Sequence, residues 1–247
     1  MSLARDPGDH SFLDGLTSVT FAVDAAGWSD AASPTTNESG GLPRDPAGSP
    51  IKRLLDVTIA ALALLAVAPL LCALCVAIKI SSPGPVLFRQ KRYGLHNRPF
   101  EIYKLRTMYV DRADPSGVTQ TRTNDERVTP LGAFLRRFNL DELPQLLNVL
   151  KGDMSLVGPR PHVPDMLAAG IKYETLVPYY FDRHRAKPGI TGLAQAHGFR
   201  GSTEDADLAV ARIKYDVAYI QSWSIVLDLK ILARTLWYEL KNRGRGV

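Results

Sequence analysis

An uncharged run from Val57 to Ile78 constrains this chain more than any other feature of its sequence. Its twenty-two residues would form about 33 Å of α-helix at a rise of roughly 1.5 Å per residue, enough to cross a hydrocarbon core of about 30 Å. The length therefore predicts a helix embedded in a membrane. A buried core helix of a soluble protein is an alternative that the run alone leaves open.

Basic residues flank this run on both sides. They are Lys52 and Arg53 before the run, and Lys79, Arg89, Lys91 and Arg92 after it. Because the positive-inside rule places such residues on the cytoplasmic side of a membrane, both flanks favour the same side. Pro69 lies inside the run and removes a backbone hydrogen bond, which can kink the helix. We therefore expect a re-entrant helix–break–helix over residues 51–80, with a single straight span as the alternative.

The first fifty residues differ in composition from the rest of the chain. They contain six glycines and five prolines and no sustained apolar period, which indicates a disordered N-terminal tail over residues 1–50. This tail has two basic and seven acidic residues, whereas residues 51–247 have 28 basic and 18 acidic residues. We expect the positive part, which includes a cytoplasmic domain over residues 81–247, to face an anionic ligand.

The cysteines and histidines indicate neither a disulfide framework nor a metal site. Cys72 and Cys75 both lie inside the apolar run, and the five histidines show no paired spacing typical of metal ligands. Two cysteines are compatible with a reducing compartment.

Beyond the apolar run, the residue pattern predicts an α+β fold with a small sheet. The expected strands are Pro85–Gln90 and Phe100–Met108. The expected amphipathic helices are Leu131–Phe138, Leu140–Leu150, Asp205–Ile220 and Ile225–Leu240. Trp223, Leu227 and Ile231 suit a belt at the membrane interface and a protein core equally well. The fold class is therefore a monotopic α+β membrane protein with amphipathic helices at the interface.

Two adjacent acids, Asp141 and Glu142, are the sharpest local feature of the sequence. A structural interpretation makes Asn139 the N-cap of a helix, Glu142 its capping-box partner and Asp141 a charge that complements the helix dipole. A functional interpretation places both carboxylates among cations, as a metal–phosphate site requires. The cations nearby in the sequence are Arg136, Arg137, Lys151 and Arg160.

Three basic residues are candidates for binding phosphate. Lys104 and Arg106 alternate along an expected strand, so both side chains would point to one face. Arg160 lies between Pro159 and Pro161, which stiffen the loop and would hold the guanidinium in a fixed pose. Taken singly, these features are better explained without a ligand: Lys104 and Arg106 as a solvated basic face, and Arg160 as an exposed charge in a Pro/Gly turn.

Seven motifs in series resemble the bacterial sugar transferases, a family of small monotopic phosphoglycosyl transferases. The motifs are KRLLD at 52–56, RQKRYG at 89–94, KLRTM at 104–108, LDELPQL at 140–146, NVLKGDMSLVGPRP at 148–161, KPGITGLAQ at 187–195 and LDLKIL at 227–232. The resemblance covers Ile51 to about Trp237. It departs from the family at Ala68, because family members often place a serine before the proline of the membrane segment.

The resemblance implies transfer of a sugar phosphate from a UDP-sugar to undecaprenyl phosphate at the cytoplasmic face of the bacterial inner membrane. It makes Asp141 and Glu142 the catalytic residues, with Asp141 as the nucleophile that forms a phosphosugar-aspartyl intermediate and releases UMP. It implies Mg²⁺ as cofactor, with Asp141 as the metal ligand. The residues expected to bind substrate phosphates are Lys104, Arg106, Arg136 and Arg160.

The sugar and the wider class of function stay open at this level. The stretch His197–Asp205 looks most like the branch that transfers glucose-1-phosphate in exopolysaccharide synthesis, while galactose-1-phosphate and N-acetylhexosamine-1-phosphate are the alternatives. A non-catalytic, membrane-anchored adaptor is the rival from another class. The apolar run disfavours a nucleic-acid binder. Membrane lipid, downstream glycosyltransferases and a second copy of the chain are further partners that the resemblance allows.

Overall fold

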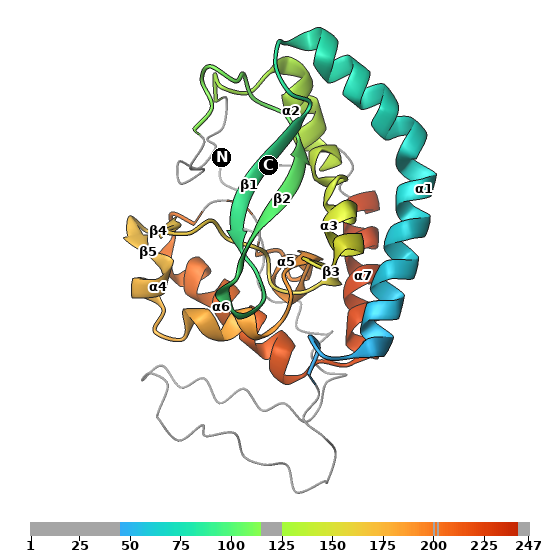
Figure 1. Cartoon of the computed structure of the whole chain (residues 1–247). Helices are drawn as coiled ribbons and strands as arrows, with labels where there is room; N and C mark the ends of the chain where they lie inside the picture. Colours follow the sequence, from blue (N-terminus) through green and yellow to red (C-terminus); the bar gives the residue numbers. More distant parts are fainter. Residues whose placement is uncertain (1–44, 115–124, 200, 202, 242–247) are drawn as a thin grey trace, which may run out of the picture. The chain divides into compact units, whose positions relative to one another are not determined.

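The computed structural model describes residues 45–114, 125–199, 201 and 203–241. Most of the predicted tail, residues 1–44, lies outside the described residues. Within the described part, helices pack around three two-stranded sheets, so the mixed helix and small-sheet class is confirmed (Figure 1).

The elements follow one another in a simple order. The longer helices are α1 (Pro50–Ser81), α2 (Pro130–Arg137), α3 (Gln145–Lys151), α6 (Ala206–Gln221) and α7 (Ile225–Lys241). The strands are β1 (Leu87–Tyr93), β2 (Pro99–Leu105), β3 (Ser155–Val157), β4 (Leu167–Ala168), β5 (Ile171–Lys172) and β6 (Gly189–Thr191). The short helical turns are η1 (Leu95–Asn97), η2 (Leu140–Glu142), α4 (Tyr173–Leu176), η3 (Tyr180–Arg185) and α5 (Leu193–Ala196).

The apolar run forms helix α1. Its N-terminus is capped by Ser49, whose hydroxyl accepts a hydrogen bond from the Lys52 amide at 3.3 Å, and Pro50 fits the first turn because no amide is needed there. The helix is 32 residues long and is not interrupted at Pro69, and Figure 1 shows one curved helix. The structure thus has a single helix where the sequence predicted two helices and a break. Its path relative to a membrane stays a prediction.

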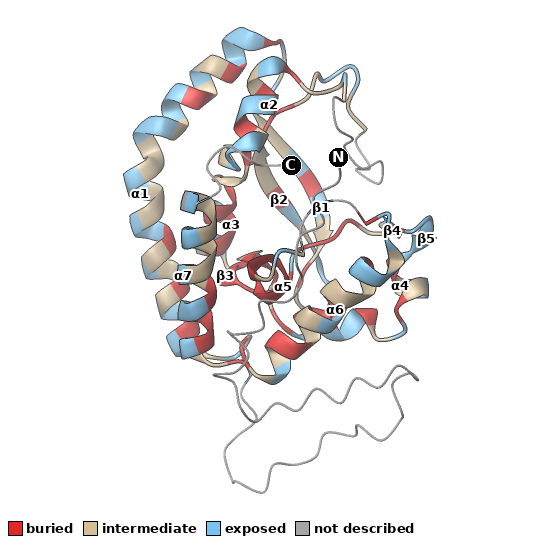
Figure 2. Cartoon of the chain, turned by 180° about the vertical axis from the view of Figure 1, so that it is seen from behind, coloured by how far each residue is buried: buried red, intermediate tan, exposed pale blue. Residues whose placement is uncertain are grey.

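One face of α1 packs on the rest of the described fold along most of its length. In the first half, Ala60 is fully buried against the core that includes Val149 and Trp223. In the second half, Leu74 and Ile78 pack with residues of β2 and α2. The opposite face is apolar and exposed, and Leu65 is 75% exposed. Figure 2 shows α1 mostly in the colours of exposed and intermediate residues, while buried residues gather in the elements beside it, such as α5. A helix that offers apolar side chains outward is suited to lipid.

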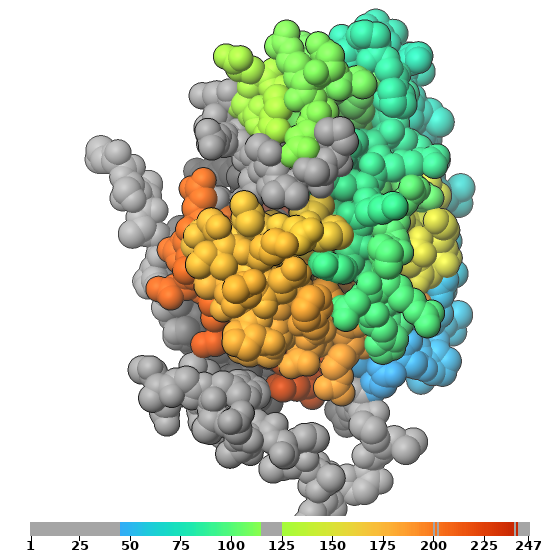
Figure 3. Space-filling view, turned by 60° about the vertical axis from the view of Figure 1, so that its left-hand side comes forward, coloured from blue at the N-terminus to red at the C-terminus, as the bar shows by residue number. Residues whose placement is uncertain are grey.

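The β1–β2 hairpin confirms the two predicted strands, shifted by a few residues. The strands are antiparallel, and Leu87 pairs with Leu105 while Tyr93 pairs with Pro99. The hairpin lies beside the segment 160–185 (Figure 3). At the turn of the hairpin, the Tyr93 amide donates to the His162 carbonyl at 3.0 Å. At the open end of the hairpin, Lys104 lies close to the acidic pair.

The predicted helix Leu140–Leu150 is wrong in its first half. Asn139 has a left-handed backbone (φ 53°) and makes no capping bond; its side-chain amide instead donates to Glu239 of α7 at 3.2 Å. The acidic pair then lies in the tight turn η2, and α3 begins only after Pro144. The capping-box interpretation therefore fails, because an asparagine in the left-handed region turns the chain sharply between α2 and η2.

The two C-terminal helices confirm the sequence pattern. Asp205 caps α6 by accepting from the Leu208 amide at 3.1 Å. Trp223, Leu227 and Ile231 are buried in the core, so packing decides between the two roles left open for them. Apolar side chains elsewhere on α7 are exposed: Val226, Leu229, Leu236 and Trp237.

Candidate active site

The acidic pair lies in turn η2, between α2 and α3. The Asp141 residue is 7% exposed, and the Glu142 side chain is 15% exposed. The turn is short because its amides bond three residues back: the Glu142 amide donates to the Asn139 carbonyl at 3.2 Å. Two carboxylates are thereby held side by side with little access to water.

Glu142 is neutralised by two cations. Its Oε1 accepts hydrogen bonds from Lys104 Nζ at 2.7 Å and from Arg160 Nη2 at 2.8 Å. Burial alone would raise the pKa of the Glu142 carboxyl, but Arg160 and then Lys104 outweigh burial and hold the pKa well below its usual range. Glu142 is therefore ionised and bound, and it fixes the positions of a lysine from β2 and an arginine from a distant loop.

Asp141 has a different environment. Burial raises the pKa of its carboxyl above the ordinary value, Lys104 and Arg136 act in the opposite direction, and Glu142 adds to the increase. Asp141 takes part in none of the ion pairs within 4.0 Å that the described residues form. The pair thus contains one carboxylate already bound to cations and one that is left for a ligand or for chemistry.

Arg136 approaches Asp141 from the last turn of α2. Its Nε donates to the Thr107 hydroxyl at 2.8 Å. Burial lowers the pKa of the Arg136 guanidinium, and Asp141 is the strongest of the groups that oppose this change. The sequence therefore named a residue that the fold does bring to the acidic pair.

Arg160 lies in the loop that follows β3. The side chain is 46% exposed, so one side of the guanidinium is open to a ligand while the other contacts Glu142. The loop backbone is closely packed, because a Cβ on Gly158 would lie 2.3 Å from the Lys187 carbonyl oxygen. The buried guanidinium of Arg183 also donates a hydrogen bond to the Arg160 carbonyl. The stiff pose expected from the flanking prolines is supported by these contacts.

The structure separates Arg106 from this group. Its guanidinium is buried and donates to the Ser82 and Pro83 carbonyls, both at 2.7 Å. We expected Lys104 and Arg106 to share one face of a strand. Strand β2 ends at Leu105, so the side chain of Arg106 does not follow the alternation of side chains along the strand. Of the four predicted phosphate ligands, Lys104, Arg136 and Arg160 lie near the acidic pair.

Sequence reasoning missed Arg92 as a neighbour of the site. Burial, and then Arg160, lower the pKa of the Arg92 guanidinium to about 10, while Glu142 opposes them. Its Nη1 donates to the Pro161 carbonyl at 3.3 Å, next to Arg160. The motif RQKRYG contains Arg92, but in the sequence Arg92 is only one of several basic residues that follow the apolar run.

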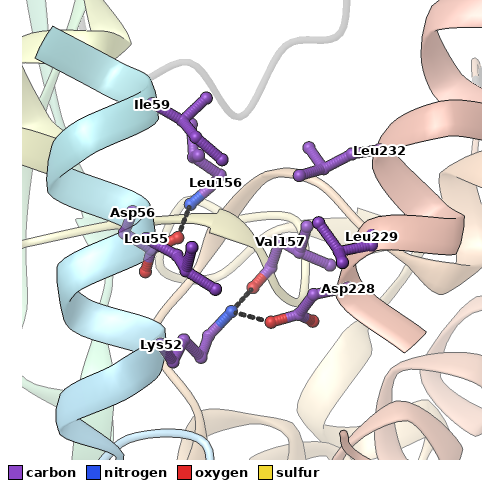
Figure 4. Close-up of a pocket in the computed structure, with 9 residues that line it drawn as sticks. All are labelled: Lys52, Leu55, Asp56, Ile59, Leu156, Val157, Asp228, Leu229 and Leu232. Atoms are coloured by element: carbon purple, nitrogen blue, oxygen red, sulfur yellow. Dashed lines mark hydrogen bonds and ion pairs between the residues drawn. The ribbon is translucent and has the colours of Figure 1, made fainter. Parts of the chain in front are cut away.

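A second buried polar cluster lies at the N-terminal end of α1 (Figure 4). Lys52 Nζ donates to Asp228 Oδ2 at 2.6 Å and to the Val157 carbonyl at 3.1 Å. Asp228 also accepts from Tyr219 at 2.8 Å and from Trp223 at 3.1 Å. The motifs KRLLD and LDLKIL therefore have a structural role, since they join α1, β3 and α7.

A profile of the bacterial sugar transferase family matches residues 47–242. The chain belongs to the bacterial sugar transferases. The resemblance seen in its motifs is confirmed, and this sugar transferase is an enzyme of the phosphoglycosyl transferase class.

Three relatives place the sugar transferase within that family. It is 50% identical over 196 residues to the exopolysaccharide production protein PSS of Rhizobium leguminosarum bv. phaseoli, covering 79% of this chain and 98% of the relative. It is 47% identical over 194 residues to the UDP-glucose:undecaprenyl-phosphate glucose-1-phosphate transferase of Escherichia coli, covering 78% of this chain and 41% of the relative. It is 40% identical over 209 residues to the UDP-N-acetylgalactosamine-undecaprenyl-phosphate N-acetylgalactosaminephosphotransferase of Aeromonas hydrophila, covering 84% of this chain and 48% of the relative. The chain thus spans less than half the length of the last two.

Proposed function

We propose that this sugar transferase moves glucose-1-phosphate from UDP-glucose to undecaprenyl phosphate at the cytoplasmic face of the bacterial inner membrane. The observation that carries the proposal is the contrast within the acidic pair: Glu142 is bound by Lys104 and Arg160, while Asp141 pairs with no cation of the described residues. The greater identity to the relative named for glucose, 47% against 40% for the one named for N-acetylgalactosamine, supports glucose.

Asp141 is the nucleophile of the first step. One carboxylate oxygen attacks the sugar-linked β-phosphorus of UDP-glucose, and the bond between that phosphorus and the bridging oxygen breaks, so UMP leaves with the bridging oxygen. The product is glucose phosphate bound to Asp141 as an acyl phosphate. Attack requires an ionised carboxylate, and Lys104 and Arg136 favour that form against the effect of burial.

The second step returns the enzyme to its starting state. An oxygen of undecaprenyl phosphate attacks the phosphorus of the intermediate, and the bond to the Asp141 oxygen breaks. The products are undecaprenyl diphosphate glucose and a free Asp141 carboxylate. Covalent catalysis of this kind replaces one difficult phosphoryl transfer by two easier ones.

The cations around the pair stabilise charge on the transferring phosphate. Arg160 offers its exposed side to a phosphate oxygen, and Lys104 binds Glu142 while its charge also lowers the pKa of Asp141. Glu142 holds both cations through hydrogen bonds shorter than 2.9 Å and therefore positions them. The protein has these positive groups in place before substrate binds, as electrostatic catalysis requires.

The residues fit a Mg²⁺ ion only if substrate completes its coordination. The described residues contain no cluster of three or more His, Cys, Asp or Glu side chains suited to a metal. Asp141 would hold the ion together with the diphosphate of the substrate, which is a common arrangement for Mg²⁺, and the ion would neutralise phosphate charge. Chelation by EDTA should stop UMP release, and added Mg²⁺ should restore it.

The anchoring of α1 supports a monotopic topology. Lys52 at its beginning binds Asp228 of α7, and Ser82 at its end binds Arg106 after β2. Both partners belong to the same set of packed elements, so a straight membrane span would have to break one of the two attachments. Helix α1 has a mean hydropathy of 2.8 in its most apolar window, and only 11% of that window is buried. We therefore place the enzyme on one face of the membrane, with α1 entering and leaving by that face.

The decisive experiment measures UMP release from a panel of UDP-sugars. The full chain in lipid nanodiscs receives UDP-glucose, UDP-galactose, UDP-N-acetylglucosamine or UDP-N-acetylgalactosamine, each with undecaprenyl phosphate. We expect release with UDP-glucose, and mass spectrometry without acceptor should find hexose phosphate on a peptide that contains Asp141. Release with another sugar alone would correct the substrate, and no release with any sugar would favour the non-catalytic adaptor.

A further inference from the structure

Arg106 holds the C-terminal end of α1. Its guanidinium donates to the Ile78 carbonyl at 3.2 Å, the Ser82 carbonyl at 2.7 Å, the Ser82 hydroxyl at 3.1 Å and the Pro83 carbonyl at 2.7 Å. The last carbonyls of a helix lack partners within the helix, and a cation at this end is favourable for the helix dipole. Arg106 therefore completes the end of the membrane helix with a side chain from the catalytic domain.

The loop after α1 is shaped around this guanidinium. Gly84 has a φ of +119°, and a Cβ at this position would lie 2.3 Å from Arg106 Nη1. Only glycine allows the backbone both this conformation and this approach. The Arg106 amide also donates to the Val86 carbonyl at 2.8 Å, so backbone and side chain of Arg106 attach to the same loop.

Four consecutive residues at the end of β2 contact four different parts of the site and its support. Lys104 binds Glu142 of the acidic pair, and Leu105 packs with apolar residues of α1 and α2. Arg106 binds the end of α1, and the Thr107 hydroxyl accepts from Arg136 Nε at 2.8 Å. Lys104 and Arg136, the two cations whose charges lower the pKa of Asp141, are thus attached within four residues to the segment that anchors the membrane helix.

Helix α2 has little freedom to move relative to Thr107. The Thr107 carbonyl accepts from the Thr129 amide at 2.9 Å, and Thr129 caps α2 by accepting from the Gly132 amide at 2.9 Å. A Cβ on Gly132 would lie 2.0 Å from the Thr107 carbonyl oxygen, so this glycine is required for the close approach. A displacement of Thr107 would therefore carry α2, and with it Arg136, along.

We infer that Arg106 and Thr107 are positioning residues that make the geometry around Asp141 depend on the seating of the membrane helix. The inference rests on the proposed function, because it concerns how the nucleophile and its cations are held. Arg106 attaches the end of α1 to the segment after β2. Thr107, the next residue, binds Arg136, so a shift of this segment would also shift Arg136. Displacements of about 1 Å at a reacting centre are enough to lower a rate by two orders of magnitude.

This role differs measurably from the binding of substrate phosphate by Arg106. A phosphate ligand holds substrate before the reaction as well as during it, so its loss raises KM for UDP-glucose. A positioning residue leaves substrate binding intact and lowers kcat. The two roles can therefore be separated by steady-state kinetics of Arg106→Lys, because lysine keeps the charge and cannot reproduce the four bonds of the guanidinium.

The main test uses a pair of variants at Thr107 in the full chain in lipid nanodiscs. Thr107→Val removes the hydroxyl that accepts from Arg136 while keeping the shape of the side chain, and Thr107→Ser keeps the hydroxyl. We expect Thr107→Val and Arg106→Lys to lower kcat at least about tenfold with KM for UDP-glucose within about twofold, and Thr107→Ser to stay within about threefold of wild type. Thr203→Val is the matched control, because Thr203 is also buried and its hydroxyl donates to the Leu167 carbonyl at 2.8 Å. It should keep wild-type kinetics.

A second measurement does not depend on activity. The Glu142 and Leu143 amides of turn η2 donate to the Asn139 and Leu140 carbonyls at 3.2 and 3.3 Å. We expect these two amides to exchange hydrogen at least about fivefold faster in Thr107→Val than in wild type, Thr107→Ser or Thr203→Val. Equal exchange in Thr107→Val and wild type would overturn the inference, and so would a KM increase without loss of kcat in Arg106→Lys. If wild-type protein releases no UMP from any UDP-sugar, the proposed function fails while exchange still decides the coupling.

Discussion

Arg183 and Asp216 form an ion pair of 2.7 Å in which the side chains are only 1% and 4% exposed. Arg183 also donates to the carbonyl of Arg160, the residue that binds Glu142 in the acidic pair. A buried ion pair contributes little net stability by itself, because desolvation offsets the attraction. Its contribution here is geometric, since Arg183 holds the backbone of the loop that carries Arg160.

We expect Asp216→Ala to destabilise the protein by about 3–5 kcal/mol, because Arg183 would be left buried without its counter-ion. The double variant Arg183→Met, Asp216→Leu should recover most of this loss and still transfer sugar phosphate slowly, because the Arg160 carbonyl has lost its donor. Thermal unfolding in nanodiscs and UMP release measure the two effects. A double variant with wild-type turnover would show that the pair does not position Arg160.

Asp141→Asn should lower turnover by about three orders of magnitude or more, because an amide cannot form the phosphosugar intermediate. Glu142→Gln is the matched control. It weakens the hold on Lys104 and Arg160 and should lower turnover less, with the adduct on Asp141 still detectable by mass spectrometry. If Asp141→Asn stays within tenfold of wild type, the covalent mechanism is wrong. An adduct on Glu142 would exchange the two roles.

The topology prediction can be tested with cysteines at the two ends of α1. In a Cys72→Ser, Cys75→Ser background, Asp45→Cys and Ser81→Cys occupy exposed positions, the first before α1 and the second at its last residue. Both should resist a membrane-impermeant thiol reagent in intact cells and react after the inner membrane is opened. Labelling of one position from outside would instead indicate a straight span.

Trp237 on α7 should contact lipid, whereas Trp223 should not. The exposed fraction is 60% for Trp237, which lies on α7, and 7% for Trp223, which lies in the short connection between α6 and α7. Fluorescence of variants that keep one of these tryptophans, with Trp28 replaced, would be compared in bilayers with and without brominated lipid. Quenching confined to Trp237 would confirm an interfacial helix. Equal quenching of both would contradict the packing of Trp223.

Stability should fall as the pH is lowered from about 6.5 towards 3. Burial, and then Arg183, lower the pKa of His184 from 6.5 to about 3. The unfolded chain therefore binds a proton at pH values where the folded chain does not, and at pH 5 this costs about 2 kcal/mol relative to pH 7. His184→Gln should flatten the pH dependence of thermal unfolding and leave a smaller slope from His162, whose pKa burial also lowers. An unchanged slope would mean that His184 is protonated in the folded state.

The site was predictable to the extent that its residues are neighbours in the chain. Asp141 and Glu142 are adjacent, and Arg136 lies within two turns of them, so composition and spacing were enough to name them. Arg160 was named because the prolines beside it are themselves sequence features. Arg92 could not be named in this way, because its place next to Arg160 comes from the packing of the hairpin on the segment after β3.

The sequence by itself determined the apolar segment, the two strands that follow it, the family and the acidic pair, because periodicity, hydrophobic length and motif order are local properties of a chain. Only the tertiary structure decided which carboxylate is bound by cations: Glu142 pairs with Lys104 and Arg160, and Asp141 takes part in none of the ion pairs of the described residues. It also placed the Arg106 guanidinium at the end of α1, where it binds the Ser82 and Pro83 carbonyls. These outcomes depend on contacts between Lys104, Glu142 and Arg160, which lie 38 and 18 residues apart, and such distances in sequence carry no information on which side chains meet.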